Sequence, residues 1–216
     1  MLTLFEELLS LSIHEAKGTF IKSSTDRLKP GLVGAILAEL ALMGKIQASN
    51  SHQLQLSDDS QTTDDILNET LCALKESEKE RKFNYWINTL SQRIAKLQKH
   101  IVKSLVQKGV ITQDDDRLSW VIPSPLQSET KASTKCLLIT RLSGIVLAQE
   151  NTQLRDIALL SLARACGLLD LLFLRDELKL ADRQINELVY SQVLNNPALQ
   201  TMQEIERAIA DLVEED

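Results

Sequence analysis

Apolar residues recur every three or four positions along most of the chain, the spacing that gathers them on one side of an α-helix. The pattern predicts helices over residues 2–12, 30–43, 64–76 and 91–108, with another around 85–87. From Thr134 the same spacing continues almost to the end, with breaks expected near Gln149, Leu174 and Pro197. Most of the chain is therefore predicted to be helical.

Residues that favour helix ends agree with several of these bounds. Thr3 followed three residues later by Glu6 fits a capping box, in which each side chain bonds the other's backbone amide. Pro30 suits the first position of a helix, because the amide hydrogen that proline lacks has no partner there. Gly44 and Gly109 are expected to end helices, since glycine adopts the left-handed backbone conformation without strain.

Two short regions alternate apolar and polar residues, which is the period of a β-strand. KIQAS and QLQLS flank Asn50-Ser51 and predict one β-hairpin, and VIT and RLSWVI flank an acidic turn at 114–116 and predict a second. Segments 57–63 and 123–134 are polar and are expected to be loops. The fold class predicted is mainly α, a single globular helical domain over residues 1–216 with small β-hairpins.

Composition agrees with a helical core. Of 216 residues, 44% are hydrophobic but only 4% are aromatic, and seven glycines leave little material for many tight turns. Cys72, Cys136 and Cys166 form no CxxC pair, so we expect small buried thiols in a protein from a reducing compartment.

No segment is expected to cross a membrane. The most apolar stretch, residues 157–174, is interrupted by Arg164 and Asp170, whereas a spanning helix needs about 20 mostly apolar residues. We expect a buried core helix there. Glu6 and Glu7 lie near the start, where a secretory signal peptide would have basic residues. Any membrane contact is therefore expected to be peripheral, in the cytoplasm.

Charge is distributed unevenly. The formal net charge is -6, yet residues 81–113 contain no Asp or Glu. The basic residues of this segment are Arg81, Lys82, Arg93, Lys96, Lys99, Lys103 and Lys108. In the predicted helix 91–108, Ile94, Leu97, Ile101 and Leu105 share one face and Arg93, Lys96, Lys99 and Lys103 the opposite one. The basic face suits an anionic membrane surface or, alternatively, contact with solvent alone.

The sequence contains no recognisable catalytic constellation. His14, His52 and His100 are scattered, and none has metal-ligand spacing with another His or Cys. There is no Gly-rich phosphate loop and no GxSxG sequence. Asp114-Asp115-Asp116 lacks the alternating ligands of a calcium loop and is interpreted as a solvated turn. We expect no enzyme activity, no metal and no cofactor.

Several segments are similar, in order, to those of the Golgi phosphoprotein 3 family. LTLFEELLSLSIHEAKGTF resembles the family's LTLxEELLLLxLxxxKGxF opening, and GLVGAILAELALMGKI resembles its GLxGxxLxELALxGRI helix. DDILNETLCAL is similar to its LLDEAL segment, YWINTLS to xWIxxLS and VKSLVQKGVIT to LxxxLVEKGVLT. The family consists of peripheral membrane adaptors that bind a phosphoinositide, so the resemblance implies a mostly helical fold and this kind of function.

The resemblance does not extend to the family's lipid pocket. That pocket has a tryptophan, the arginine of a GLRG sequence and two arginines on the helix before KGVL. The corresponding positions here are Ser24, Val33, Ala95 and Gln98, and none matches. A phosphate favours arginine forks and several donors. We therefore expect more diffuse binding of anionic lipid, by cations near these positions that face the same side: Lys22, Arg27, Lys29, Arg93, Lys96, Lys99 and Lys103.

The second hairpin offers an apolar contact for a bilayer. Trp120, Val121 and Ile122 are consecutive, and tryptophan favours the membrane interface. The hypothesis is that they form an apolar tip that enters the bilayer. The alternative is ordinary packing of Trp120 against a neighbouring helix.

Two functions stay open. The first is a peripheral adaptor that binds an anionic phospholipid membrane, with phosphatidylinositol 4-phosphate as the candidate lipid, and recruits short tails of membrane proteins. The second is a soluble protein–protein interaction module that kept the fold but lost lipid recognition. Eukaryotic members of the family have an arginine-containing N-terminal tail before the domain, whereas the resemblance here begins at Leu2, so we expect a bacterial or minimal member. A eukaryotic member would act at the cytosolic face of the Golgi.

Nucleic-acid binding is not expected. A helix followed by KIQAS and QLQLS imitates a winged helix, but only Lys45 and His52 are available there for phosphate contacts. Binding to a duplex needs several such contacts, and the chain is acidic overall.

Overall fold

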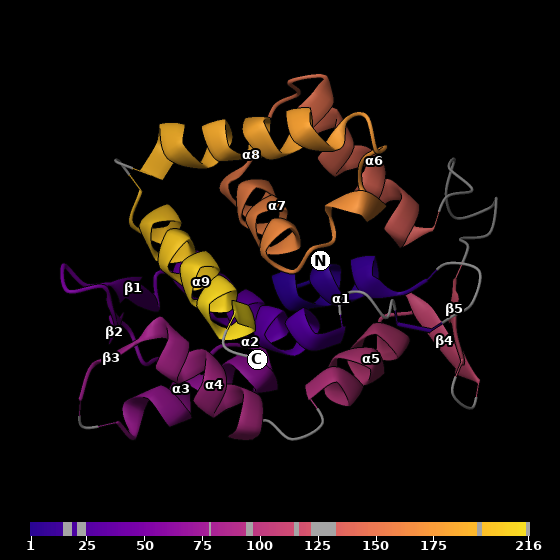
Figure 1. Cartoon of the computed structure of the whole chain (residues 1–216). Helices are drawn as coiled ribbons and strands as arrows, with labels where there is room; N and C mark the ends of the chain where they lie inside the picture. Colours follow the sequence, from indigo (N-terminus) through magenta and orange to yellow (C-terminus); the bar gives the residue numbers. More distant parts are fainter. Residues whose placement is uncertain are drawn as a thin grey trace.

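The computed structural model describes residues 1–14, 19–20, 25–77, 79–93, 97–114, 117–121, 133–193 and 196–214. Figure 1 shows α1 and α2 at the middle of the molecule, with the other helices around them. The helices are α1 (Leu4–Ser12), α2 (Thr25–Leu42), α3 (Asp65–Lys75), α4 (Phe83–Arg93), α5 (Leu97–Gln107), α6 (Thr134–Leu147), α7 (Leu154–Ala165), η2 (Leu169–Leu171), α8 (Leu178–Val193) and α9 (Pro197–Glu214). The predicted fold class, mainly α with small β-hairpins, is confirmed.

Both predicted hairpins are present. β1 (Ile46–Ala48) pairs with β2 (Gln53–Leu56), and β4 (Ile111–Asp114) pairs with β5 (Arg117–Trp120), both antiparallel. A third strand, β3 (Arg81–Lys82), adds to the outer edge of β2 and was not predicted. β3 has two residues, both exposed, so it is too short to show an alternating pattern.

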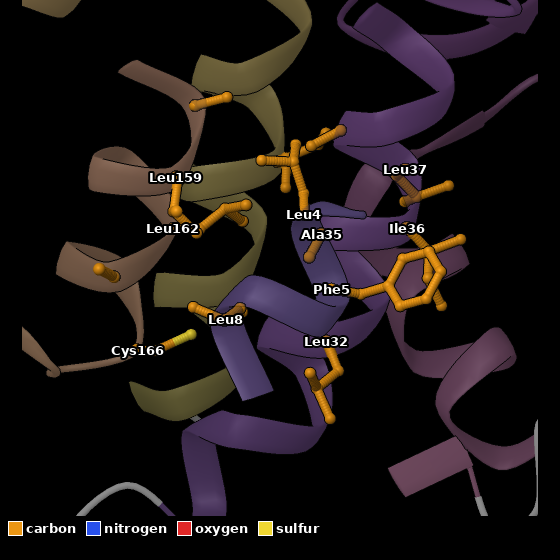
Figure 2. Close-up of a cluster of buried hydrophobic side chains, with 14 of the residues drawn as sticks. Leu4, Phe5, Leu8, Leu32, Ala35, Ile36, Leu37, Leu159, Leu162 and Cys166 are labelled. Carbon is orange, nitrogen blue, oxygen red and sulfur yellow. The ribbon is translucent and has the colours of Figure 1, made fainter. Parts of the chain in front are cut away.

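Helix α2 forms the centre of the core. Every residue from 31 to 41 is buried, because α1, α4, α7 and α9 all pack against this helix. Leu32, Ile36, Leu37, Leu40 and Ala41, which recur at helical spacing, are buried, but they are only part of the buried surface of this helix. Figure 2 shows residues of α1, α2 and α7 meeting in this cluster.

Two predicted bounds of α2 had different outcomes. Gly44 has a φ of 72°, as a helix-ending glycine requires, and Lys45 donates its backbone N–H to Leu40 O at 2.9 Å. Pro30, however, lies inside α2 and not at its start, which is at Thr25. Leu28 is buried one turn before Leu32, so the longer helix adds an apolar contact to the core, a gain that outweighs one missing backbone hydrogen bond.

The predicted helix over residues 91–108 is two helices. α4 includes Arg93, α5 begins at Leu97, and residues 94–96 lie outside the described part of the chain. Within α5 the predicted faces are confirmed: Leu97, Ile101 and Leu105 are buried, while Lys99 and Lys103 are exposed. Gly109, with a φ of 67°, follows the helix as predicted.

The prediction that all three cysteines are buried was wrong. Cys72 and Cys136 are exposed on the outer faces of α3 and α6, because the helical period that buries their apolar neighbours turns them outward. Cys166 is buried at the end of α7, and burial raises the pKa of its thiol to about 12.

The apolar stretch 157–174 is not one helix. α7 ends at Ala165, and Gly167, with a φ of 66°, begins a turn into η2. Glycine favours such a turn, but the continuous apolar pattern hid it. None of the helices in the described part of the chain is long and apolar enough to cross a membrane.

Candidate functional site

The exposed face of α5 is the most cationic helical surface in the segment that lacks acidic residues. Lys99 and Lys103 lie one turn apart, and α5 contains no Asp or Glu. Neither lysine has an ion-pair partner within 4.0 Å among the described residues. Their charges are therefore available to an external anion, and we call Lys99 and Lys103 the α5 basic pair.

The other predicted lipid-binding residues have different surroundings. Arg93 donates a hydrogen bond to Glu76 at 2.6 Å, which joins the ends of α4 and α3 and raises the pKa of the guanidinium. Arg27 and Lys29 are exposed near the start of α2. Lys22 and Lys96 lie outside the described residues. The expectation that all these cations face the same side of the membrane stays a prediction.

Lys108, the last basic residue of the segment, is bound internally. Its Nζ lies 2.6 Å and 2.7 Å from the two carboxylate oxygens of Glu6, a side chain with no exposed surface. Ser104 donates its hydroxyl to the same carboxylate at 2.6 Å. Burial raises the pKa of Glu6, but the hydrogen bonds from Lys108, Ser104 and Thr3 lower it further, so the net shift is downward.

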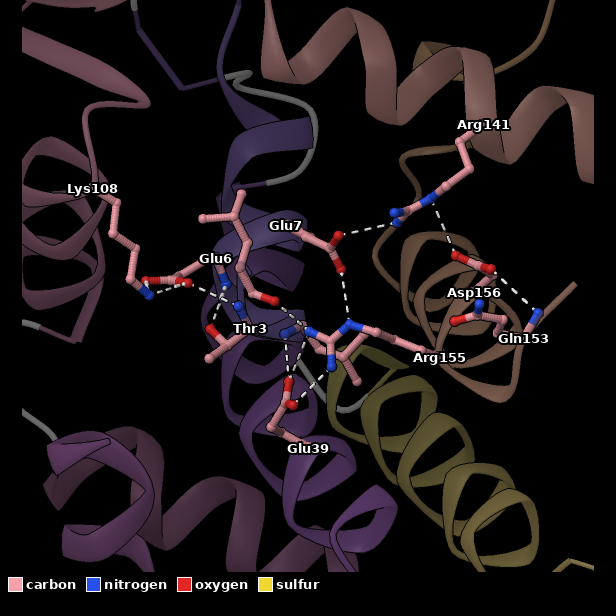
Figure 3. A network of polar contacts seen from close by, with 11 residues as sticks. Thr3, Glu6, Glu7, Glu39, Lys108, Arg141, Gln153, Arg155 and Asp156 are labelled. Carbon is pink, nitrogen blue, oxygen red and sulfur yellow. Dashed lines mark hydrogen bonds and ion pairs between the residues drawn. The ribbon is translucent and has the colours of Figure 1, made fainter. Parts of the chain in front are cut away.

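Beyond Glu6, a buried polar network joins α1 to α2, α6 and α7 (Figure 3). Arg155 binds both carboxylate oxygens of Glu39, at 2.8 and 3.1 Å. Glu7 accepts a hydrogen bond from Arg141 at 3.0 Å, and its second oxygen lies 3.5 Å from Nε of Arg155, too far for a good hydrogen bond. Burial raises the pKa of Glu7, and the two arginines only partly offset this.

Sequence reasoning did not find this network. The capping box of Thr3 and Glu6 was predicted and is confirmed, with Thr3 N donating to Glu6 at 2.8 Å. One signal could have found the network: Glu6 and Glu7 are consecutive carboxylates in an otherwise apolar helix, and every residue of this helix is buried. Buried acids are almost always paired, so these two glutamates indicate cationic partners.

The second hairpin follows α5 directly. Trp120 is paired with Ile111 at the open end of the hairpin, while Asp114 and Arg117 lie beside the turn. Trp120 therefore does not lie at the turn of the hairpin: it is half-buried and packs against the core, and its entry into a bilayer stays a prediction. Val121 is also half-buried, and Ile122 lies outside the described residues.

Two of the four positions that correspond to the family's lipid pocket lie among the described residues. Val33 has no exposed surface and packs in the core, and Gln98 is half-buried on α5. Ser24 and Ala95 lie outside the described residues. The described chain also contains no cluster of three or more His, Cys, Asp or Glu side chains that is arranged to hold a metal ion.

These features define a class of protein: a helical globule with one basic helix face and an internal polar network. The family model described as Golgi phosphoprotein 3 (GPP34) matches residues 4–209. The chain therefore belongs to the Golgi phosphoprotein 3 family.

A curated relative is the vacuolar protein sorting-associated protein 74 of Eremothecium gossypii. It is 28% identical over 130 residues, which cover 51% of this chain and 39% of that protein. The match therefore spans well under half the length of this relative.

Proposed function

We propose that this protein is a peripheral membrane adaptor that binds anionic phospholipid through the exposed face of α5. The observation that supports this most directly is the α5 basic pair: Lys99 and Lys103 have no ion partner in the described chain and no acid on their own helix. The chain as a whole has a formal net charge of -6, so attraction to an anionic leaflet depends on a local basic face such as this one. Membership of the Golgi phosphoprotein 3 family supports the adaptor role.

The lipid and the cargo are the finer parts of the proposal. The candidate lipid is phosphatidylinositol 4-phosphate, and the candidate cargo is the short tail of a membrane protein. Half-buried Trp120 and Val121 adjoin α5 and would supply an apolar contact at the interface. Arg27 and Lys29 would add charge if the membrane reaches the start of α2.

Vesicle flotation tests the proposal. Wild-type protein is compared with Lys99→Glu/Lys103→Glu and with a control of equal charge change, Arg175→Glu/Lys179→Glu, whose exposed side chains lie in and before α8. A basic residue near an anionic leaflet contributes on the order of 1 kcal/mol, so the α5 variant should bind at least about 30-fold more weakly. Equal loss in both variants would contradict a specific role for α5.

The lipid arm of the same experiment compares phosphatidylinositol 4-phosphate with phosphatidylserine at matched surface charge and at two salt concentrations. Preference for the phosphoinositide that persists in salt supports a headgroup site. Equal binding that fades with salt supports generic electrostatic attraction, because exposed charges are screened beyond about 8 Å at physiological ionic strength.

The alternative is a soluble protein–protein interaction module. Two observations favour it: Val33 is closed into the core, and Arg93 is already paired with Glu76. A stoichiometric protein partner recovered by pull-down, together with no affinity for either vesicle, would support this alternative against the membrane proposal.

A further inference from the structure

The C-terminal end of α5 is hydrogen-bonded to a buried carboxylate on α1. Glu6, on α1, accepts hydrogen bonds from Ser104 at 2.6 Å and from Lys108 at 2.6 and 2.7 Å. Both donors belong to the last turn of α5 and the residue after it, and they are four positions apart, so they lie on the same side of the helix. Figure 3 shows the Lys108 side chain reaching across to Glu6.

The carboxylate itself is held rigidly. Thr3 N donates to Glu6 Oε2 at 2.8 Å, and the Thr3 side chain accepts from Glu6 N in return. Glu6 has no exposed surface, so its oxygens are shielded from bulk solvent. The side chain is thus fixed by the capping box of α1 and presents a directed acceptor to α5.

Directionality distinguishes this contact from the rest of the interface. Leu97, Ile101 and Leu105 are buried, and apolar burial favours contact without fixing the rotation of a helix about its axis. Hydrogen bonds depend strongly on angle, so two of them from neighbouring turns fix that rotation. The rotation of α5 decides where Lys99 and Lys103 point.

The constraint also extends to the second hairpin. Lys108 is followed by Gly109, whose φ of 67° turns the chain, and Val110 N donates to Leu105 O at 3.0 Å. Val121 N then donates to Val110 O at 3.1 Å, next to Trp120. Hydrogen bonds and the short backbone segments between them therefore link Glu6, through the end of α5, to the base of the hairpin.

We propose that Glu6 is the positioning residue of the lipid-facing surface: through Lys108 and Ser104 it fixes the orientation of α5 and the hairpin, so that Lys99, Lys103 and Trp120 are presented together. This inference rests on the proposed function for its lipid part. Its structural part, the coupling of Glu6 to Trp120, is testable without lipid. Lys108 is thereby a structural cation and not a lipid contact.

The adjacent residue provides a matched control. Glu7 is also a buried glutamate of α1, but it contacts Arg141 of α6 and Arg155 of α7 and forms no hydrogen bond or ion pair with the described residues of α5. Glu7→Gln therefore makes the same chemical change one residue away. A role in orienting α5 predicts different outcomes for the two variants, whereas a role in core stability alone predicts similar ones.

The first measurement uses Trp120 as a reporter in a Trp86→Phe background. Trp86 is 4% exposed and its Nε1 has no hydrogen-bond partner in the described chain, so phenylalanine removes no bond. Glu6→Gln and Lys108→Met should shift Trp120 emission to longer wavelength and increase its quenching by iodide. Lys108→Arg should restore the wild-type signal, because guanidinium also pairs with carboxylate, and Glu7→Gln should leave the signal unchanged.

The second measurement is vesicle affinity of the same variants at 20 mol% anionic lipid. Glu6→Gln and Lys108→Met should bind about threefold to tenfold more weakly, with Lys108→Arg and Glu7→Gln at wild-type affinity. If Glu6→Gln does not fold, Lys108→Met and the milder Ser104→Ala give the same test.

A Trp120 signal that is unchanged in the folded variants would overturn the inference. If wild-type protein binds no vesicles but the Trp120 signal responds, the proposed function fails and the positioning role of Glu6 stands.

Discussion

Two consecutive glutamates, Glu6 and Glu7, are buried in the same helix and have opposite pKa shifts. Hydrogen bonds from Lys108, Ser104 and Thr3 lower the pKa of Glu6 despite its burial. Burial raises the pKa of Glu7. The nearby Arg141 and Arg155 offset this rise only in part, because only Arg141 forms a good hydrogen bond with the Glu7 carboxylate. The number and geometry of donors, and not burial alone, decide the direction of each pKa shift.

These shifts predict opposite effects of pH on stability. Ionised Glu6 stabilises the fold above its unfolded-state pKa, near 4.5, and this contribution is lost as the pH falls through its lower folded-state pKa. Glu7 behaves conversely: its ionised form costs stability above its raised folded-state pKa, and the cost disappears as the pH falls below about 4.5.

Glu6→Gln should therefore be more destabilising at pH 7 than at pH 3.5, because the wild-type protein has the benefit of ionised Glu6 only at the higher pH. Glu7→Gln should be less destabilising at pH 7 than at pH 3.5, because ionised Glu7 costs the wild-type protein stability at the higher pH. Urea unfolding of the three proteins at both pH values measures this. Parallel pH profiles for the two variants would contradict the assigned shifts.

At the scale of elements, the sequence predicted helices and hairpins well but not their junctions. Period and turn residues such as Gly44 and Gly109 are local signals, so the elements that they bound were found. The start of α2 before Pro30 and the short strand β3 depend on contacts with distant segments, such as Leu28 with the core and Lys82 with Gln53. No local pattern records such contacts.

The packing of α2 against the end of α7 is a sharp test of the element arrangement. A Cβ atom added at Gly31 would lie 2.1 Å from Sγ of Cys166, while its next neighbours, at 3.7 Å, leave ordinary room. Gly31→Ala should destabilise the protein by about 1–3 kcal/mol, as overpacking does. Adding Cys166→Ala removes the sulfur, so the double variant should be more stable than Gly31→Ala alone.

Thermal or urea unfolding of the wild type, both single variants and the double variant gives the coupling free energy. Alanine is also favoured over glycine within a helix by about 1 kcal/mol, which adds to the recovery. Additive effects of the two substitutions would mean that α2 and the end of α7 do not approach as closely as the position of Cys166 beside Gly31 indicates. Figure 2 shows Cys166 within the cluster that α1, α2 and α7 form.

At the scale of the whole molecule, the site was less predictable than the fold. The amphipathic pattern of α5 identified Lys99 and Lys103 as outward-facing, because a helix face is a local property. The pairing of Arg93 with Glu76 and of Lys108 with Glu6 joins residues 17 and 102 positions apart. Whether a given cation is free or paired therefore required the tertiary structure.

The two tryptophans lie in different regions of this fold and allow a test of its unity. Trp86 is on α4, beside the β1–β3 sheet, and Trp120 is in the β4–β5 hairpin (Figure 1). Because α1 and α2 contact helices on both sides, we expect the chain to unfold as one cooperative unit.

Fluorescence of Trp86→Phe and Trp120→Phe in urea should give transitions with the same midpoint, after correction for any stability change seen by circular dichroism in each variant. If the Trp120 region unfolds at a lower urea concentration than the helical signal of the same variant, α5 and the hairpin form a separate unit, and the single-domain prediction is wrong.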